Sequence, residues 1–344
     1  DNEDLTDHLK TADFFDVETY PTATFTSTAI EAAAARLEGV VVRTPLLQNA
    51  ELDRIADGTV LIKPECFQPI GSFKIRGAYN LLSQLTPEQA AKGVVAWSSG
   101  NHAQGVALAG KLLGIHAAIV MPADAPAAKL ESTRRLGGEI ITYDRYSEDR
   151  EAIARQVAAE RGAEIVPSYE HDSIIAGQGT AGLEIAQQAA ELGLQVDNLL
   201  VCCGGGGLTA GCAIAMHAHF PNARVYTVEP EDFDDTARSL VSGQRERVAD
   251  DARSICDALQ AHTPGKLTFE INRRLLGAGL VVSDDEVREA MRFAFRHLKM
   301  VVEPGGAVAL AALLAGRIDV SGQTTVVVIS GGNVDLEVYD EVQC

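Results

Sequence analysis

The sequence predicts an α/β fold built on mostly parallel sheets that helices cover on both faces. From about residue 60, short runs rich in β-branched residues alternate with longer stretches of helical period. Alternation of this kind is typical of parallel strands joined by crossover helices. The 344 residues give room for about two domains, or for one domain inserted in another.

Seven strands are expected, each a short, mainly apolar run. In chain order they are 60–65, 94–99, 117–122, 139–144, 198–203, 224–229 and 324–330. Start signals predict three of the intervening helices, at Thr86 before a proline, at Ser147 before EDREAIARQ, and at Ser283 before DDEVREAM. No low-complexity tract and no repeat of solenoid period interrupts the pattern.

The composition narrows the ligands that the chain can bind. A formal net charge of -19 argues against non-specific binding to nucleic acid or to an anionic membrane. No apolar run approaches the roughly 18 residues of a membrane span, and the acidic start lacks the basic region of a signal peptide. The six cysteines show no metal-ligand spacing, which predicts reduced thiols in a cytoplasmic enzyme. An anionic ligand must therefore be held locally, by backbone amides and a few side chains.

Four consecutive glycines, 204–207, follow the strand LLVCC and open a helix. Glycine lets the backbone approach a ligand closely, and a helix start offers unpaired N–H groups, so the junction suits a phosphate. Gly205, Gly207 and Ala210 also match the dinucleotide fingerprint GxGxxA, with Glu229 placed as the ribose-binding acid. A nicotinamide-dependent dehydrogenase is therefore a rival prediction. Against it, several strand–helix units precede the loop, whereas the fingerprint usually opens its domain.

Two further loops repeat this layout of strand, turn and helix. The stretch SSGNHAQG places Ser98, Ser99, Asn101 and His102 at a helix N-terminus, where amides and hydroxyls suit a carboxylate. The stretch SGG at 330–332 ends another buried strand. Ligands of open α/β sheets bind beyond the carboxyl ends of the strands. The loops, together with the lysine of GSFKIRGA, are thus expected to converge on one crevice.

The motifs GSFKIRGA, SSGNHAQG, IIAGQGT, CGGGGL, VEPGGAVALAALL and SGGNVD resemble, in this order, the fold type II pyridoxal phosphate (PLP) enzymes. Within them the chain looks most like the serine/threonine dehydratases and serine racemases, over roughly residues 30–338. The resemblance implies two three-layer αβα domains with the active site in the cleft between them. The large PLP-binding domain would comprise 28–93 and 171–344, and the small domain 94–170. A homodimer or homotetramer acting on a small amino-acid substrate is also implied.

The resemblance assigns roles to individual residues. Lys74 would form the Schiff base with PLP and act as the catalytic base, and Ser99 would reprotonate the opposite face of the substrate in a racemase. The residues expected to bind the cofactor are Phe73, Lys74, Asn101, Gly204, Gly205, Gly206, Gly207, Leu208, Glu303 and Ser330. The residues expected to receive the substrate carboxylate are Ser98, Ser99, Asn101 and His102.

These roles predict β-elimination, in which L-threonine or L-serine gives 2-oxobutyrate or pyruvate plus ammonia. A neutral hydroxyl, that of Ser330, opposite the pyridine nitrogen favours prompt loss of the β-hydroxyl over transamination. Tyr169 stands where animal serine racemases carry asparagine, which also favours a dehydratase. Serine racemase and 3-hydroxyaspartate dehydratase stay as alternatives on the same fold. The second carboxylate of 3-hydroxyaspartate needs an extra basic contact that the sequence does not locate.

Two segments carry separate hypotheses. In VEPEDFDD, Glu229, Asp235 and the carbonyl of Phe233 match a divalent-cation site of the resembled enzymes, whose oxygen ligands suit Mg²⁺ or Ca²⁺. A solvated acidic helix start explains the same residues equally well. Residues 1–27 do not fit the alternation and look like a fragment of the YceI family of lipid-binding barrels. They are interpreted as an appended leader or fusion segment, and a lipid-binding module rests on them alone.

Overall fold

Two sheets organise the computed structural model, which describes residues 27–125 and 127–343. The larger sheet has the strand order β1-β2-β10-β7-β8-β9, and every neighbouring pair is parallel except β1 with β2. Its strands are β1 (Leu47–Gln48), β2 (Thr59–Pro64), β7 (Asn198–Cys202), β8 (Arg224–Pro230), β9 (Leu276–Val282) and β10 (Thr324–Ile329).

The smaller sheet is entirely parallel and has the order β5-β4-β3-β6. Its strands are β3 (Val94–Trp97), β4 (Ala117–Pro122), β5 (Glu139–Tyr143) and β6 (Glu164–Ile165). All four strands come from one continuous stretch of chain, 94–165, which interrupts the strands of the larger sheet. The two sheets confirm the predicted α/β fold, while the expected domain boundaries at 93 and 170 stay a prediction.

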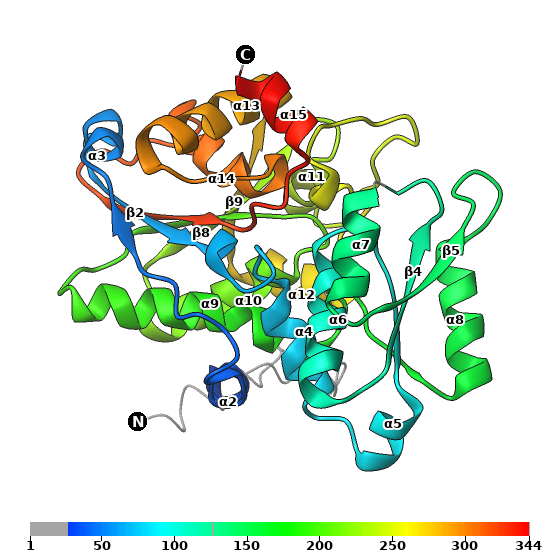
Figure 1. Cartoon of the computed structure of the whole chain (residues 1–344). Coiled ribbons are helices and arrows are strands. Elements are labelled where there is room, and N and C mark those ends of the chain that lie inside the picture. The colour runs from blue at the N-terminus through cyan, green and yellow to red at the C-terminus, as the bar shows by residue number, and fades with distance from the viewer. Residues whose placement is uncertain (1–26, 126, 344) are drawn as a thin grey trace.

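Helices cover both faces of each sheet (Figure 1). The α-helices are α2 (Ser27–Leu37), α3 (Ala50–Ala56), α4 (Lys74–Leu82), α5 (Pro87–Lys92), α6 (Asn101–Leu113), α7 (Ala127–Arg135), α8 (Arg150–Arg161), α9 (Asp172–Glu191), α10 (Gly207–His219), α11 (Asp235–Ser242), α12 (Lys266–Leu275), α13 (Asp284–Phe293), α14 (Pro304–Leu314) and α15 (Leu336–Gln343). Two short 3₁₀ helices are η1 (Glu65–Phe67) and η2 (Asp257–Leu259), and η3 (Ala294–Leu298) is a short π-helix.

The coverage by helices explains why the strands are apolar on both sides. In the larger sheet, α13 and α14 lie on one face and α9 and α10 on the other (Figure 1). Every residue of the β4 sequence AAIVMP is buried, and so are the last five residues of β10. Parallel strands that are covered on both faces read as continuous apolar runs, which is the pattern that predicted them.

Helix capping confirms two of the three predicted helix starts. Thr86 and Ser283 each form a reciprocal capping box with the residue three positions later. The start predicted at Ser147 is wrong, because the carboxylate of Asp149 caps α8 by accepting from the amides of Glu151 (2.8 Å) and Ala152 (3.3 Å). The Ser147 hydroxyl instead donates to Asp144 at 2.8 Å. A nearer and stronger acceptor therefore moves the helix start by two residues.

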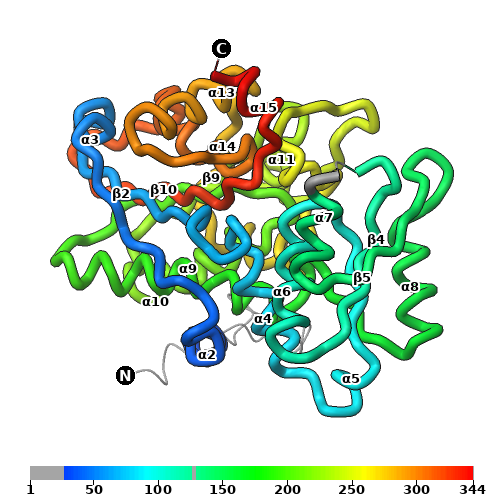
Figure 2. Tube along the Cα trace, in the orientation of Figure 1, coloured from blue at the N-terminus to red at the C-terminus, as the bar shows by residue number. Residues whose placement is uncertain are grey.

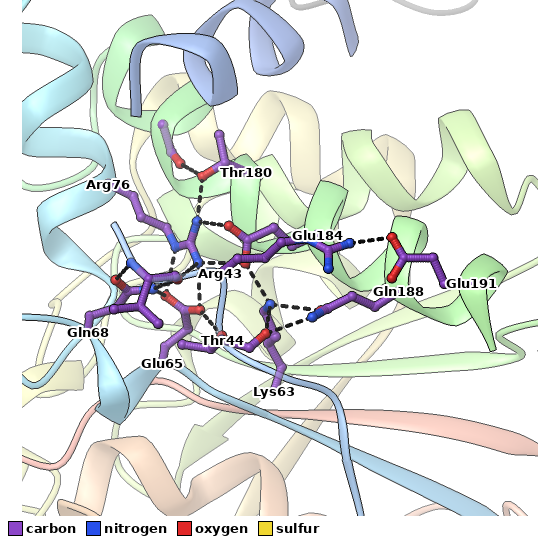
Figure 3. A network of polar contacts seen from close by, with 12 residues as sticks. Arg43, Thr44, Lys63, Glu65, Gln68, Arg76, Thr180, Glu184, Gln188 and Glu191 are labelled. Carbon is purple, nitrogen blue, oxygen red and sulfur yellow. Dashed lines mark hydrogen bonds and ion pairs between the residues drawn. The ribbon is translucent and has the colours of Figure 1, made fainter. Parts of the chain in front are cut away.

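A network of buried charges joins α4 to β2 and α9 (Figure 3). The guanidinium of Arg76 donates to both oxygens of Glu65, at 2.7 and 2.8 Å, and to Glu184 at 2.7 Å. Lys63 donates to the same Glu184 at 2.6 Å. Arg76, Glu65 and Lys63 have no exposed surface. Two acids and two bases leave the network formally neutral, and its contacts fix the helix that begins at Lys74.

The segment before α4 is attached to the segment after β10, although the two are far apart in sequence (Figure 2). The Phe73 amide donates to the Ser330 carbonyl at 3.1 Å, and the Gly332 amide donates to the Gly71 carbonyl at 2.9 Å. Gly71 adopts a φ of +72°, a left-handed conformation that glycine accepts without strain. These bonds place the start of α4 directly beside the end of β10.

Two other predictions, on membrane spans and on cysteines, can be compared with the structure only for the described residues. No helix within 27–125 and 127–343 is long and apolar enough to cross a membrane. The cysteines of that part, Cys66, Cys202, Cys203, Cys212 and Cys256, form no disulfide. The likeness of the first 27 residues to the YceI family falls almost wholly on residues outside the described ranges and stays a prediction.

Candidate active site

A cavity of about 430 Å³ lies beyond the carboxyl ends of β3, β7 and β10. Every residue predicted to bind the cofactor or the substrate carboxylate lines this cavity. They are Phe73, Lys74, Ser98, Ser99, Asn101, His102, Gly204, Gly205, Gly206, Gly207, Leu208, Glu303 and Ser330. The structure thus brings together loops from both sheets.

Lys74 is the first residue of α4 and points its amine into the cavity. The amine donates to the Ser168 carbonyl at 3.0 Å and lies 5.1 Å from the centroid of the Phe73 ring. Burial lowers the pKa of Lys74 to about 8, although nearby Cys202 and Glu303 act in the opposite direction. Roughly a tenth of the amine is therefore neutral at pH 7, far more than at the ordinary lysine pKa, and this fraction is available as a nucleophile or base.

The four-glycine loop forms the opposite wall. Gly206 has a φ of +89°, and a Cβ at Gly205 would lie 2.2 Å from the Tyr169 ring, so both positions require glycine. The first intrahelical bond of α10 runs from the Ala210 amide to the Gly206 carbonyl, at 2.9 Å. The preceding amides at the helix start have no intrahelical acceptor and carry the positive end of the helix dipole. This wall suits a phosphate group.

Asn101 links the start of α6 to the start of α14. Its side-chain amide donates to Glu303 at 2.7 Å, and its side-chain carbonyl accepts from Asn333 at 2.7 Å. Burial raises the pKa of Glu303 to about 8, and the charge of Asp257 adds to the effect. Glu303 is therefore mostly protonated near pH 7 and brings little negative charge to the cavity.

His102 is held as a neutral imidazole. Burial lowers its pKa to about 3, and Lys74 contributes in the same direction. Its Nε2 lies 2.8 Å from the Val166 carbonyl, and since a carbonyl only accepts, Nε2 carries the proton and donates. The predicted carboxylate site therefore gains no positive charge from His102. Its binding capacity lies in the hydroxyls of Ser98 and Ser99 and in the amides at the start of α6.

Four charged residues that the sequence did not single out also line the cavity: Lys129, Arg150, Asp257 and Asp335. Lys129 lies 3.1 Å from Asp257 and 3.6 Å from Asp335, so its charge is already paired. The guanidinium of Arg150, the first residue of α8, forms no hydrogen bond or ion pair within the described part of the chain. No local motif marks Arg150, because only the crossovers of the smaller sheet bring α8 to the cavity.

Residues 37–331 match the model of the family described as "Pyridoxal-phosphate dependent enzyme". The chain belongs to this family. Family membership decides between the two predicted ligands of the glycine loop, in favour of PLP and against a nicotinamide dinucleotide.

Relatives of this PLP enzyme carry three different activities in their names. An "L-threo-3-hydroxyaspartate ammonia-lyase" of Pseudomonas sp is 46% identical over 307 residues, which cover 89% of this chain and 95% of the relative. An "L-threonine ammonia-lyase" of Thermotoga maritima is 38% identical, covering 91% of this chain and 77% of the relative. A solved maize serine racemase superposes with a TM-score of 0.87 at 39% identity, covering 92% and 96% of the two chains. Membership of the family therefore does not fix which substrate this enzyme converts.

The cavity residues fit PLP. A buried lysine of lowered pKa suits its aldehyde, and the unpaired amides at the start of α10 suit its phosphate. The ring of Phe73 lies beside the lysine, and Ser330 at the end of β10 offers a neutral hydroxyl for the pyridine nitrogen. The glycines leave open the space that a side chain would fill.

The predicted cation site lies outside the cavity, between β8 and α11. Glu229 caps α11 by accepting from the amides of Thr236 (3.0 Å) and Ala237 (2.7 Å). Both carboxylate oxygens of Asp235 are buried without a hydrogen-bond partner. Burial raises the pKa of Asp235 to about 7, and burial together with Asp235 raises that of Glu229.

Unpartnered buried oxygens of this kind fit a hard cation such as Mg²⁺ or Ca²⁺. The described residues hold no group of three or more His, Cys, Asp or Glu side chains able to bind a metal. A site here would therefore depend on the backbone carbonyl of Phe233 as the third protein ligand, next to Glu229 and Asp235, and it stays a prediction.

Proposed function

We propose that this PLP enzyme is an ammonia-lyase for L-serine and L-threonine. It removes the β-hydroxyl and the amino group and yields pyruvate or 2-oxobutyrate plus ammonia. The observation that carries the proposal is a buried amine of lowered pKa, on Lys74, in a cavity whose other wall offers a neutral hydroxyl at Ser330.

Different residues of the cavity can bind the substrate, accept its proton and exclude water in this reaction. PLP, when bound, withdraws electrons from the α-carbon of the amino acid. The amides and hydroxyls at the start of α6 receive the substrate carboxylate and so fix the direction of the α-hydrogen. The neutral amine of Lys74 accepts that proton. Burial of the amine against Phe73 and Ser168 excludes water that would otherwise compete for it.

The polarity around Ser330 supports elimination over transamination. A hydroxyl does not favour a proton on the pyridine nitrogen as a carboxylate does. Glu303, whose amide donates to the carbonyl of the adjacent Gly331, is mostly protonated near pH 7 because burial raises its pKa to about 8. With weaker delocalisation of the α-carbon charge, loss of the β-hydroxyl is favoured over reprotonation elsewhere.

A second candidate substrate is L-threo-3-hydroxyaspartate, and Arg150 is the specific observation that favours it. Its guanidinium lines the cavity and has no partner within the described residues. A β-carboxylate is the group that such a guanidinium binds well. Arg150 therefore supplies the basic contact that the sequence did not locate. The 46% identical relative named for this substrate adds support.

A substrate panel tests both candidates. The holoenzyme is incubated with L-serine, L-threonine and L-threo-3-hydroxyaspartate, and pyruvate, 2-oxobutyrate and oxaloacetate are separated and quantified, while chiral chromatography measures D-serine. Pyruvate and 2-oxobutyrate as dominant products support the proposal. D-serine in excess of pyruvate overturns it.

Arg150→Met separates the two substrates within one protein. If Arg150 binds the β-carboxylate, kcat/KM for L-threo-3-hydroxyaspartate falls by about 30- to 100-fold, the equivalent of one charged hydrogen-bonded contact, while kcat/KM for L-serine stays within about threefold. Exposed Arg155 on the same helix gives the matched control Arg155→Met. An equal loss for all three substrates contradicts the role of Arg150.

A further inference from the structure

Helix α12 lies behind the glycine loop, on the side away from the cavity. Residues 204–207 line the cavity, whereas Thr268 and Asn272 of α12 do not. The Thr268 hydroxyl donates to the Gly205 carbonyl at 2.6 Å, and the Asn272 side-chain amide approaches the Gly206 carbonyl at 3.4 Å. Thr268 is fully buried and Asn272 is 1% exposed. Two consecutive carbonyls of the loop are therefore directed toward α12.

The direction of a carbonyl fixes the direction of the next amide. In a planar trans peptide the C=O and the N–H point to opposite sides. With the Gly205 carbonyl held toward α12, the Gly206 N–H points to the cavity side, where the phosphate of PLP is expected. Gly206 has a φ of +89°, and glycine has little intrinsic preference for one orientation of its peptide over another. A contact from outside the loop therefore has to set the orientation of the Gly205–Gly206 peptide.

The helix that provides this contact is itself held in place. Glu170 accepts a hydrogen bond from the Leu267 amide in the first turn of α12. Glu170 directly follows Tyr169, whose ring covers Gly205, and lies two residues from Ser168, whose carbonyl holds the Lys74 amine. One short segment, 168–170, thus contacts the lysine, the glycine loop and the helix behind it.

We propose that Thr268 is a positioning residue for the cofactor phosphate. Its hydroxyl holds the Gly205–Gly206 peptide with the N–H toward the phosphate, and Asn272 supports the next peptide. Thr268 touches neither substrate nor cofactor. The inference rests on family membership and on PLP binding, and is independent of which amino acid the enzyme converts.

The test compares PLP with pyridoxal, which has the same aldehyde and ring but no phosphate. Apoprotein prepared from the holoenzyme is titrated with each compound, and the two dissociation constants are measured from the absorbance of the bound chromophore. Thr268→Val removes the hydroxyl at nearly constant volume. We expect the Kd for PLP to rise about tenfold, the equivalent of one hydrogen bond, and the Kd for pyridoxal to stay within twofold.

Two further variants make the result specific. Thr268→Ser keeps the hydroxyl and should bind both compounds as the wild type does. Thr133→Val removes another buried hydroxyl that donates to a backbone carbonyl, that of Lys129 at 3.0 Å, and should leave the ratio of the two constants unchanged. If Thr268→Val does not fold, Thr268→Ala replaces it, since it adds no bulk.

Equal weakening of PLP and pyridoxal by Thr268→Val overturns the proposal, because it indicates general loosening of the site. An unchanged Kd for PLP overturns it as well. The ratio of constants is read without any substrate, so failure of the ammonia-lyase activity and failure of this inference are separate outcomes.

Discussion

Replacing Arg76 by methionine tests whether the buried charge network holds α4 in place. Arg76→Met keeps a long apolar stem and removes the cation that bonds both Glu65 and Glu184 (Figure 3). Three charges then remain, two acids and Lys63, and Glu65 has no exposed surface through which water could compensate. Removing one partner of a buried ion pair costs about 3–5 kcal/mol.

The expected change in melting temperature follows from the size of the protein. An unfolding entropy of roughly 2.1 cal/mol/K per residue gives about 0.6 kcal/mol/K for the roughly 300 residues that the structure describes. A loss of about 3–5 kcal/mol then lowers the melting temperature by about 5–8 °C. Thermal unfolding followed by circular dichroism at pH 7 measures this shift. The exposed pair of Arg54 with Glu51 gives the matched control Arg54→Met, which should melt as the wild type does.

The same network predicts how the difference depends on pH. Burial alone would raise the pKa of Glu65, but Arg76, together with Lys63 and the Thr44 hydroxyl, outweighs burial, and the pKa is lowered. A lowered carboxyl pKa stabilises the folded state above the ordinary value of about 4.3 and loses this effect as the pH falls through the folded value. In Arg76→Met, Glu65 becomes protonated at higher pH. The gap between the two proteins should therefore narrow between pH 7 and pH 4. A shift below about 2 °C at pH 7, or a gap independent of pH, refutes this account.

Two more predictions concern the cofactor and the cation, and one concerns the stereochemistry. Burial lowers the pKa of Lys74 to about 8, so the rate at which PLP rebinds to apoprotein should rise with pH and level off above about 8; a rate still rising at pH 10 contradicts this. Added Mg²⁺ should raise the melting temperature of the wild type and not of Asp235→Asn, and no rise in the wild type argues against the cation site. Ser99→Ala should abolish any D-serine formation and, because a hydroxyl that receives the substrate carboxylate is also lost, should raise KM for L-serine while kcat for pyruvate formation stays within about threefold; an unchanged ratio of D-serine to pyruvate contradicts the role of Ser99.

The parts of the fold that the sequence predicted are those with repeated, independent signals. All seven expected runs are strands, and all but the edge strand β5 are mostly buried apolar segments. Strand β9 was missed since its sequence LGAGLVV carries two glycines, and β1 and β6 are only two residues long. Short edge strands depend on their neighbours more than on their own residues.

The site residues also divide into those that the sequence predicted and those that it did not. Lys74 and the glycine loop are recognisable from adjacent residues, because a turn and a helix start need particular residues in a row. Arg150 and Thr268 carry no such signal. Each lies on an ordinary amphipathic helix. Only tertiary packing brings Arg150 to the cavity and Thr268 to the back of the glycine loop.

The bridge between Ser72 and Gly331 has a consequence for protein synthesis. Lys74 leaves the ribosome long before β10, the strand whose end holds Ser72 and Phe73 beside it. A nascent chain that does not yet extend to Gly331 therefore lacks the neighbour that orients its own nucleophile. Capture of the vitamin must wait until β10 has been made, and until then β2 keeps an unpaired edge on the side where β10 later binds.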